Sequence, residues 1–338
     1  MITIDGSYLE GGGQILRTAI ALSAITQKPV CVENIRAGRP KPGLKPSHLA
    51  SISLASEFCD ADHKGLGIGS QRVEFYPGKI HEVNVNRTIG TAGSITLVFQ
   101  AIAPIACFAP KKSVITLHGG TNVAWSPPVE FFTHVFSHTL EKHMSPKIRT
   151  KEILHGFYPK GGGAVKIEVS PAKIINPINL TKQGKLQKID LHAVASESLC
   201  KAKVCERMIA GFKSICPEKN ISEHIKYVKT ASVGASLHAH AHYENTKLGA
   251  EALGKRGTPA ESVGKECARK LGKEMASGAA VDHRLADQLM IFMALANGNS
   301  EIKTSRISNH IKTNKYVIEQ FLPVKFEIIR NVIKCKKI

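Results

Sequence analysis

A short basic segment near the N-terminus has the residue types of a phosphate-binding loop. Residues 35–48 (IRAGRPKPGLKPSH) hold four Lys or Arg side chains, one histidine, three prolines and two glycines. Guanidinium groups match phosphate oxygens bidentately, and proline lowers the entropy cost of ordering the loop. The segment therefore predicts a phosphate clamp, although an ordinary solvated basic turn has a similar charge pattern.

Glycine clusters recur where short alternating segments give way to helical ones. They occupy residues 10–14 (EGGGQ), 90–94 (GTAGS) and 161–163 (GGG). Free backbone N–H groups at the start of a helix can bind an anion, but a triple glycine alone is weak evidence. The first cluster is not a P-loop, because the Lys-Ser/Thr pair is missing.

Two groups of histidines stand out among the fifteen in the chain. His238, His240 and His242 alternate with alanines, which on a strand places three imidazoles on one face, with Glu244 continuing the alternation. Ligands along one straight strand do not easily converge on a metal ion, so an exposed strand face is the favoured interpretation. His310 lies instead in a polar turn, residues 308–314, between a basic segment and an apolar one.

The glycine clusters indicate a degenerate repeat of about 75 to 80 residues that combines strands and helices. The polar segment 176–188 indicates a domain boundary, and separate strand and helix patterns follow it until about residue 279. The final segment then returns to the pattern of strands and helices seen before the boundary. An insertion within a larger domain explains this order better than two consecutive domains.

Composition limits the classes of protein that fit. The 46 Lys and Arg exceed the 27 Asp and Glu, giving a net charge of +19, which points to a polyanionic partner. The eight cysteines form no C-x-x-C pair, so we expect mostly reduced core residues, with pairing left open. We expect no transmembrane helix, no signal peptide and a cytoplasmic location.

Taken together and in order, several long motifs resemble the RNA 3'-terminal phosphate cyclase family. The resemblance runs from residue 1 to about 325. The motifs are Asp5-Gly6, residues 10–17 (EGGGQILR), 35–44 (IRAGRPKPGL), 90–94 (GTAGS), 155–163 (HGFYPKGGG) and the His310-x-x-Thr313-Asn314 signature.

The resemblance implies an α+β fold. Repeated βαβαββ units, like the C-terminal domain of translation initiation factor three, would form a large catalytic domain from residues 1–182 and 279–338. A smaller α/β domain, residues 183–278, would be inserted into it. The oligomeric state stays open, with a homodimer as one alternative.

The resemblance also implies an activity, the ATP-dependent conversion of an RNA 3'-phosphate into a 2',3'-cyclic phosphodiester, with release of AMP and pyrophosphate. In that family the histidine at the position of His310 attacks the α-phosphorus of ATP. The RNA 3'-phosphate then takes the AMP, and the neighbouring 2'-hydroxyl displaces it. Mg²⁺ or Mn²⁺ would offset the phosphate charge.

Further site residues follow by motif position. Glu10 is expected as a metal ligand, and the phosphate contacts are expected at Arg17, Arg36, Arg39 and His48. The adenylate contacts are expected at Gln100, Pro127, Phe131, Arg284, Leu285, Ala286, Asp287 and Gln288. Bacterial members of the family place an aromatic residue at the position of Arg284, so stacking on adenine would here involve a guanidinium.

Two other classes remain as alternatives. A non-catalytic relative that acts in ribosomal RNA processing shares the fold and the glycine motifs but lacks the nucleophilic histidine, so His310 argues against it. An enolpyruvyl transferase has a related repeat architecture and an anionic substrate, but it needs no covalent histidine-AMP.

Overall fold

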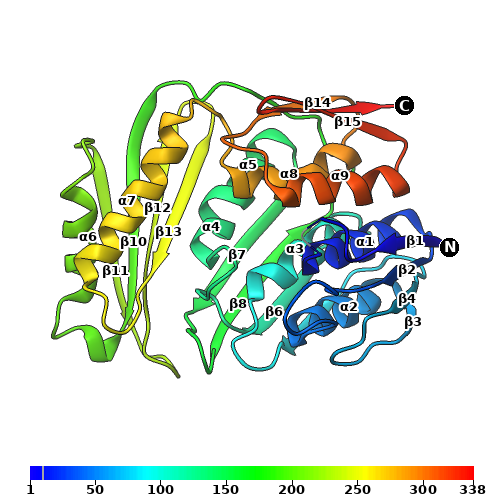
Figure 1. Cartoon of the computed structure of the whole chain (residues 1–338), viewed down its shortest axis with the longest axis horizontal. Coiled ribbons are helices and arrows are strands. Elements are labelled where there is room, and N and C mark those ends of the chain that lie inside the picture. The colour runs from blue at the N-terminus through cyan, green and yellow to red at the C-terminus, as the bar shows by residue number, and fades with distance from the viewer. Residues whose placement is uncertain (10) are drawn as a thin grey trace.

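The computed structural model describes residues 1–9 and 11–338. Three units with the same βαβαββ order make up its larger part, and a fourth group of elements, drawn at the left of Figure 1, is inserted into the last of them. The first strands of the three units begin at residues 2, 84 and 179, a somewhat longer period than the glycine clusters predict.

The first unit lies at the N-terminus. Its elements are β1 (Ile2–Asp5), α1 (Gly13–Thr26), β2 (Val30–Glu33), α2 (Pro46–Cys59), β3 (Asp62–Lys64) and β4 (Val73–Tyr76). The sheet order is β1-β2-β4-β3, so the first two strands are parallel and the last two are antiparallel to their neighbours. Helix α1 ends where Gln27 adopts a left-handed conformation with φ of 57°.

The second unit repeats this arrangement with a longer second helical segment. Its elements are β5 (Asn84–Thr88), α3 (Ile95–Cys107), β6 (Ser113–Gly119), α4 (Val129–Phe131), the π-helical turn η1 (Phe132–Phe136), α5 (Ser137–His143), β7 (Lys147–Leu154) and β8 (Gly163–Ser170). The sheet order β5-β6-β8-β7 matches that of the first unit.

The third unit is split after its first strand. It consists of β9 (Asn179–Leu180), α8 (His283–Leu295), β14 (Ser300–Lys303), α9 (Asn309–Phe321), β15 (Val324–Ile329) and β16 (Val332–Lys337). Strand β9 nevertheless pairs in parallel with β14, and the order β9-β14-β16-β15 is again that of the first unit.

The inserted elements form a sheet of their own. They are β10 (Leu186–Ser196), the 3-10 turn η2 (Glu197–Leu199), α6 (Val204–Lys213), β11 (Ile221–Val228), β12 (Ala235–Tyr243), β13 (Lys247–Leu253) and α7 (Ala260–Ala276), with strand order β11-β10-β12-β13. Helices α6 and α7 cover one face of this sheet, and a separate hydrophobic cluster fills the space between them. We call residues 186–276 the inserted module.

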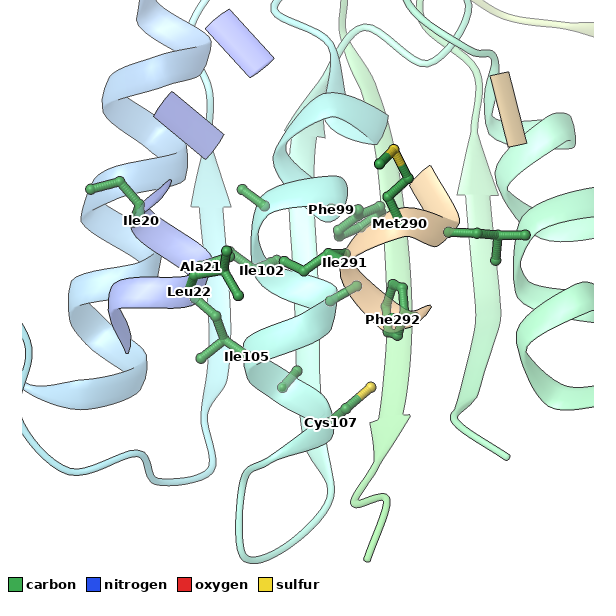
Figure 2. Packing of buried hydrophobic residues seen from close by; sticks show 14 of the residues in the cluster. Ile20, Ala21, Leu22, Phe99, Ile102, Ile105, Cys107, Met290, Ile291 and Phe292 are labelled. Carbon is green, nitrogen blue, oxygen red and sulfur yellow. The ribbon is translucent and has the colours of Figure 1, made fainter. Parts of the chain in front are cut away.

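A second, larger cluster joins the three units. Helix α3, which is apolar apart from Thr96 and Gln100, lies between α1 and α8 in Figure 2. Ile102 and Phe99 of α3 are fully buried there with Leu22 of α1 and Phe292 of α8. Because α1 and α8 come from opposite ends of the chain, this cluster fixes the first unit against the third.

The predicted α+β fold of repeated βαβαββ units is confirmed. The division at residues 183 and 278 stays a prediction, although the module's own sheet and core support it. All eight cysteines are free thiols, and six of them are buried. None of the helices in the described ranges is long and apolar enough to cross a membrane.

Candidate active site

His310 lies in the first turn of α9. The hydroxyl of Ser308 caps this helix by accepting a hydrogen bond from the backbone N–H of Ile311 at 3.1 Å. The imidazole is 42% exposed, and its Nδ1 atom lies 3.2 Å from Oδ2 of Asp287, whose side chain is only 15% exposed. One ring nitrogen is thus directed at a largely buried carboxylate.

Three helices hold this pair in place. Asn314, one turn after His310, donates a 2.7 Å hydrogen bond from Nδ2 to the backbone carbonyl of Asp287 in α8. Its Oδ1 accepts a 2.8 Å bond from the hydroxyl of Thr18 in α1. Gln14, at the start of α1, donates to the carbonyl of His310 at 3.4 Å. Helices from the first and third units therefore meet around the histidine.

A cavity of about 580 Å³ opens beside His310, between the inserted module and all three repeated units. The three repeated units contribute Gln14, Arg17, Gln100, Val123, Ala124, Trp125, Ser126, Pro127, Pro128, His283, Arg284, Asp287, Gln288, Arg306 and Ser308. The module contributes Glu251, Leu253, Lys255, Glu266 and Lys270. The volume suits a nucleotide-sized ligand.

Charged groups of both signs line this cavity. Burial lowers the pKa of the Arg17 guanidinium to about 10, and the charge of Asp287 opposes that shift, so Arg17 is a cation at pH 7. Arg284 forms an ion pair with Glu251 of β13, which ties α8 to the inserted module. This contact already engages the guanidinium that the sequence suggested for stacking on adenine.

The basic loop lies against the first glycine cluster. Nε2 of His48 faces Gly13 so closely that a side chain at Gly13 would collide with it. Burial, together with the charges of Arg17, Arg36 and Lys45, lowers the pKa of His48 to about 3, so this imidazole is neutral at pH 7. Its Nδ1 accepts a 3.1 Å hydrogen bond from the backbone N–H of Lys45.

The two predicted arginines of the loop differ in their surroundings. Arg36 donates from Nη1 to the carbonyls of Lys41 and Gly43 at 2.7 and 2.9 Å, so it holds the loop in shape. Arg39 reaches the surface of the glycine turn at Gly12. Their predicted contacts with phosphate stay predictions, and Glu10, the expected metal ligand, lies outside the described residues.

The predicted adenylate contacts fall into two groups. Gln100, Pro127, Arg284, Asp287 and Gln288 line the cavity. The side chains of Phe131, Leu285 and Ala286 are fully buried in the hydrophobic core, and the cavity lining does not include them.

Several cavity residues were not predicted from the sequence. The sole tryptophan, Trp125, is 99% exposed at the cavity and has a left-handed φ of 67°. The one feature of the sequence that could have indicated Trp125 is its position two residues before Pro127, an expected adenylate contact. Asn314 belongs to the motif that follows His310, but only the structure shows that its amide bridges α1 and α8.

The sequence of the chain matches that of a known protein family over most of its length. The model of the family described as RNA 3'-terminal phosphate cyclase matches residues 8–328. The chain belongs to the RNA 3'-terminal phosphate cyclase family. This membership confirms the resemblance drawn from the motifs.

Curated relatives cover almost the whole chain. An RNA 3'-terminal phosphate cyclase from Pyrococcus abyssi is 42% identical to this chain, and the alignment covers 100% of this chain and 98% of that protein. The protein of the same name from Archaeoglobus fulgidus is also 42% identical, over 99% and 100% of the two chains. Among solved structures, the enolpyruvyl transferase NikO from Streptomyces tendae aligns with this chain at 8% sequence identity and a TM-score of 0.28. The alignment covers 100% of this chain and 82% of the NikO chain. A TM-score this low establishes no shared fold.

Proposed function

We propose that the protein is an ATP-dependent ligase that converts an RNA 3'-terminal phosphate into a 2',3'-cyclic phosphodiester, with His310 as the residue that carries AMP. Family membership supports the cyclase activity and the use of ATP as co-substrate. The observation that carries the mechanism is the half-exposed imidazole of His310 on a nucleotide-sized cavity, with a carboxylate at its Nδ1 atom.

This arrangement suits nucleophilic attack. If Nδ1–H of His310 donates to Asp287, Nε2 carries the lone pair that attacks phosphorus. The N–P bond to the α-phosphorus forms as the bond to pyrophosphate breaks, and the product is a histidine-AMP phosphoramidate. Asp287 stabilises the positive charge that develops on the imidazole.

Two further transfers complete the reaction. An oxygen of the RNA 3'-phosphate attacks the phosphoramidate, which frees His310 and forms an RNA-adenylate with a new P–O–P linkage. The 2'-hydroxyl then attacks the terminal RNA phosphorus, AMP leaves, and the 2'-hydroxyl loses its proton. Arg17, which lines the cavity, and Arg39, which lies beside Gly12, are the cations that would contact the phosphates.

Among the residues that the structure describes at this site, the carboxylates suit a divalent ion that is also held by the nucleotide. The cavity offers the carboxylates of Glu251, Glu266 and Asp287, but the described residues that come close enough to form a three-ligand cluster lie elsewhere. Mg²⁺ and Mn²⁺ commonly use one or two carboxylates together with substrate phosphates. Such an ion would neutralise phosphate charge.

The test is label transfer from α-labelled ATP. Wild-type protein should acquire an acid-labile, alkali-stable label that 3'-phosphate RNA discharges, whereas His310→Ala and His310→Asn should acquire none. His63→Ala, which replaces an exposed histidine of β3, is the matched control and should be labelled normally. Labelling of folded His310→Ala would disprove the nucleophile, and no label on wild type would favour the non-catalytic RNA-binding alternative.

A further inference from the structure

An unusual group of histidines lies at the boundary between the inserted module and the second unit. Strand β12 directs Leu237, Ala239 and Ala241 into the module's own core, so the alternating His238, His240 and His242 face the other way. That face is not open to solvent, because His238 and His240 are each only 1% exposed. The expectation of an exposed strand face was therefore wrong.

The second unit supplies what covers this face. Phe131 of α4 packs edge-on against His238, with the ring centres 6.2 Å apart. His134, in the π-helical turn η1, stacks on His192 of β10 at 4.4 Å and on His240 at 5.2 Å. In Figure 1 the helix α4 lies beside β13 and β12, at the side of the module's sheet away from α6 and α7.

Three of these histidines come from three different segments, so they avoid the geometric problem of ligands along one strand. His134, His192 and His240 each offer a ring nitrogen, and the three nitrogens lie within 4.8 Å of one another. Their rings are nearly parallel, at 11° to 17°. Because imidazole lone pairs lie in the ring plane, binding one ion requires these rings to turn about χ2, which is a soft torsion.

Two of the imidazoles have nitrogens that lack a hydrogen-bond partner. Among the described residues, Nε2 of His192 and Nδ1 of His240 are buried and bonded to nothing. An unsatisfied buried nitrogen is costly unless a ligand occupies it.

A carboxylate sits behind His240 in the arrangement common at metal-binding histidines. Oδ2 of Asp190 lies 3.5 Å from Nε2 of His240 and 2.7 Å from Nε2 of His242. If Nε2 of His240 carries the proton and donates it to Asp190, the lone pair on Nδ1 can bind a metal ion.

We propose that His134, His192 and His240 bind one zinc ion, which joins the inserted module to the second unit. Three imidazoles with a water as the fourth ligand give the tetrahedral nitrogen-rich set that Zn²⁺ prefers. Mg²⁺ favours oxygen ligands, so the proposed zinc site is distinct from a site for Mg²⁺ bound with ATP. None of the three residues lines the cavity beside His310.

The experiment uses the full-length, tag-free protein, stripped with a chelator and then titrated with Co²⁺ and Zn²⁺ in the absence of nucleotide. Wild type should bind one equivalent of Co²⁺ with the visible absorption of four-coordinate cobalt, and Zn²⁺ should displace it. His134→Asn and His192→Asn, one on each side of the boundary, should lose this spectrum. Asp190→Asn removes the carboxylate charge beside His240 and leaves the three ligands in place, so it should weaken binding about 10- to 100-fold.

Two control variants locate the ion. His63→Asn removes an exposed histidine, and His310→Asn removes the proposed nucleophile; both should still bind one equivalent. Unchanged binding by folded His134→Asn and His192→Asn would overturn the proposal, as would a wild type that takes up no Zn²⁺. If both variants misfold, X-ray absorption on the zinc-loaded wild type decides, because three imidazole ligands support the site and an oxygen-only shell contradicts it.

Discussion

The hydroxyl of Thr18 donates a buried 2.8 Å hydrogen bond to the side-chain carbonyl of Asn314. This bond joins the first helix of the chain to the helix that carries His310. Removing the hydroxyl would leave a buried oxygen unsatisfied, since both residues are less than a tenth exposed.

We therefore expect Thr18→Val to lower the free energy of unfolding by about 1 to 3 kcal/mol. Urea denaturation measures this directly. The matched control is Thr26→Val in the same helix, where the hydroxyl bonds only to the carbonyl of Leu22, and its effect should stay near 0.5 kcal/mol or less. Equal losses in the two variants would mean that the bond between α1 and α9 contributes nothing specific.

Asp287→Asn should slow the formation of histidine-AMP by about 100-fold or more while the fold persists. An amide that donates to Nδ1 of His310 favours the tautomer with the proton on Nε2, which removes the nucleophilic lone pair. Single-turnover labelling with saturating α-labelled ATP measures this rate. A merely structural role for Asp287 would leave the pH profile of that rate unchanged, whereas our interpretation predicts a shift.

Arg39→Ala should weaken binding to 3'-phosphate RNA and lower its salt dependence. Loss of one phosphate contact on a single strand reduces the slope of log affinity against log salt by about 0.7. Fluorescence anisotropy across a salt series gives the slope. Lys336→Ala, an exposed cation on β16 that pairs with Glu327, is the control and should leave the slope unchanged. If Arg39→Ala alters only the affinity for ATP, the assignment of the loop to RNA is wrong.

Acid should destabilise the protein through His48. The folded-state pKa of His48, about 3, is below the ordinary value of 6.5, so the unfolded chain binds a proton first as the pH falls. Stability is therefore lost below pH 6.5, at up to about 1.4 kcal/mol per pH unit for this one residue. Other buried histidines add to the loss.

The contribution of His48 can be isolated by comparing pH dependences. Between about pH 7 and about pH 5.5, His48→Asn should lose about 1 kcal/mol less stability than wild type. His63→Asn, with an exposed imidazole, should follow the wild-type curve. Parallel curves for wild type and His48→Asn would show that His48 titrates normally in the folded protein.

The sequence predicted the repeated units and singled out His310, which the structure places on the cavity, because glycine turns and a continuous set of family motifs determine local structure. Side-chain direction was partly readable as well. In α8, Arg284, Asp287 and Gln288 follow the i, i+3, i+4 spacing and face the cavity, whereas Leu285 and Ala286 lie between them and face the core. A motif assigns a segment to a site, but helical period decides which side chains reach it.

Contacts between distant segments were beyond reach of the sequence. The composition of the loop predicted the same role, a phosphate contact, for Arg36 and Arg39. In the structure, however, Arg36 has a left-handed backbone and its guanidinium bonds to the carbonyls of the loop itself. The histidines of β12 looked exposed because nothing in their alternation reveals that η1 covers them. That covering depends on how the module docks, and only the tertiary structure fixes it.

The interruption of the third unit imposes an order on folding. Strand β9 pairs with β14 across a separation of about 120 residues, so its sheet requires closure of a very long loop unless the intervening chain has already condensed. The inserted module, with its own sheet and core, can condense first and bring the two strands near each other. Helix α9 emerges later still from the ribosome, so the segment that bears His310 joins the first two units and the inserted module after they have been synthesised.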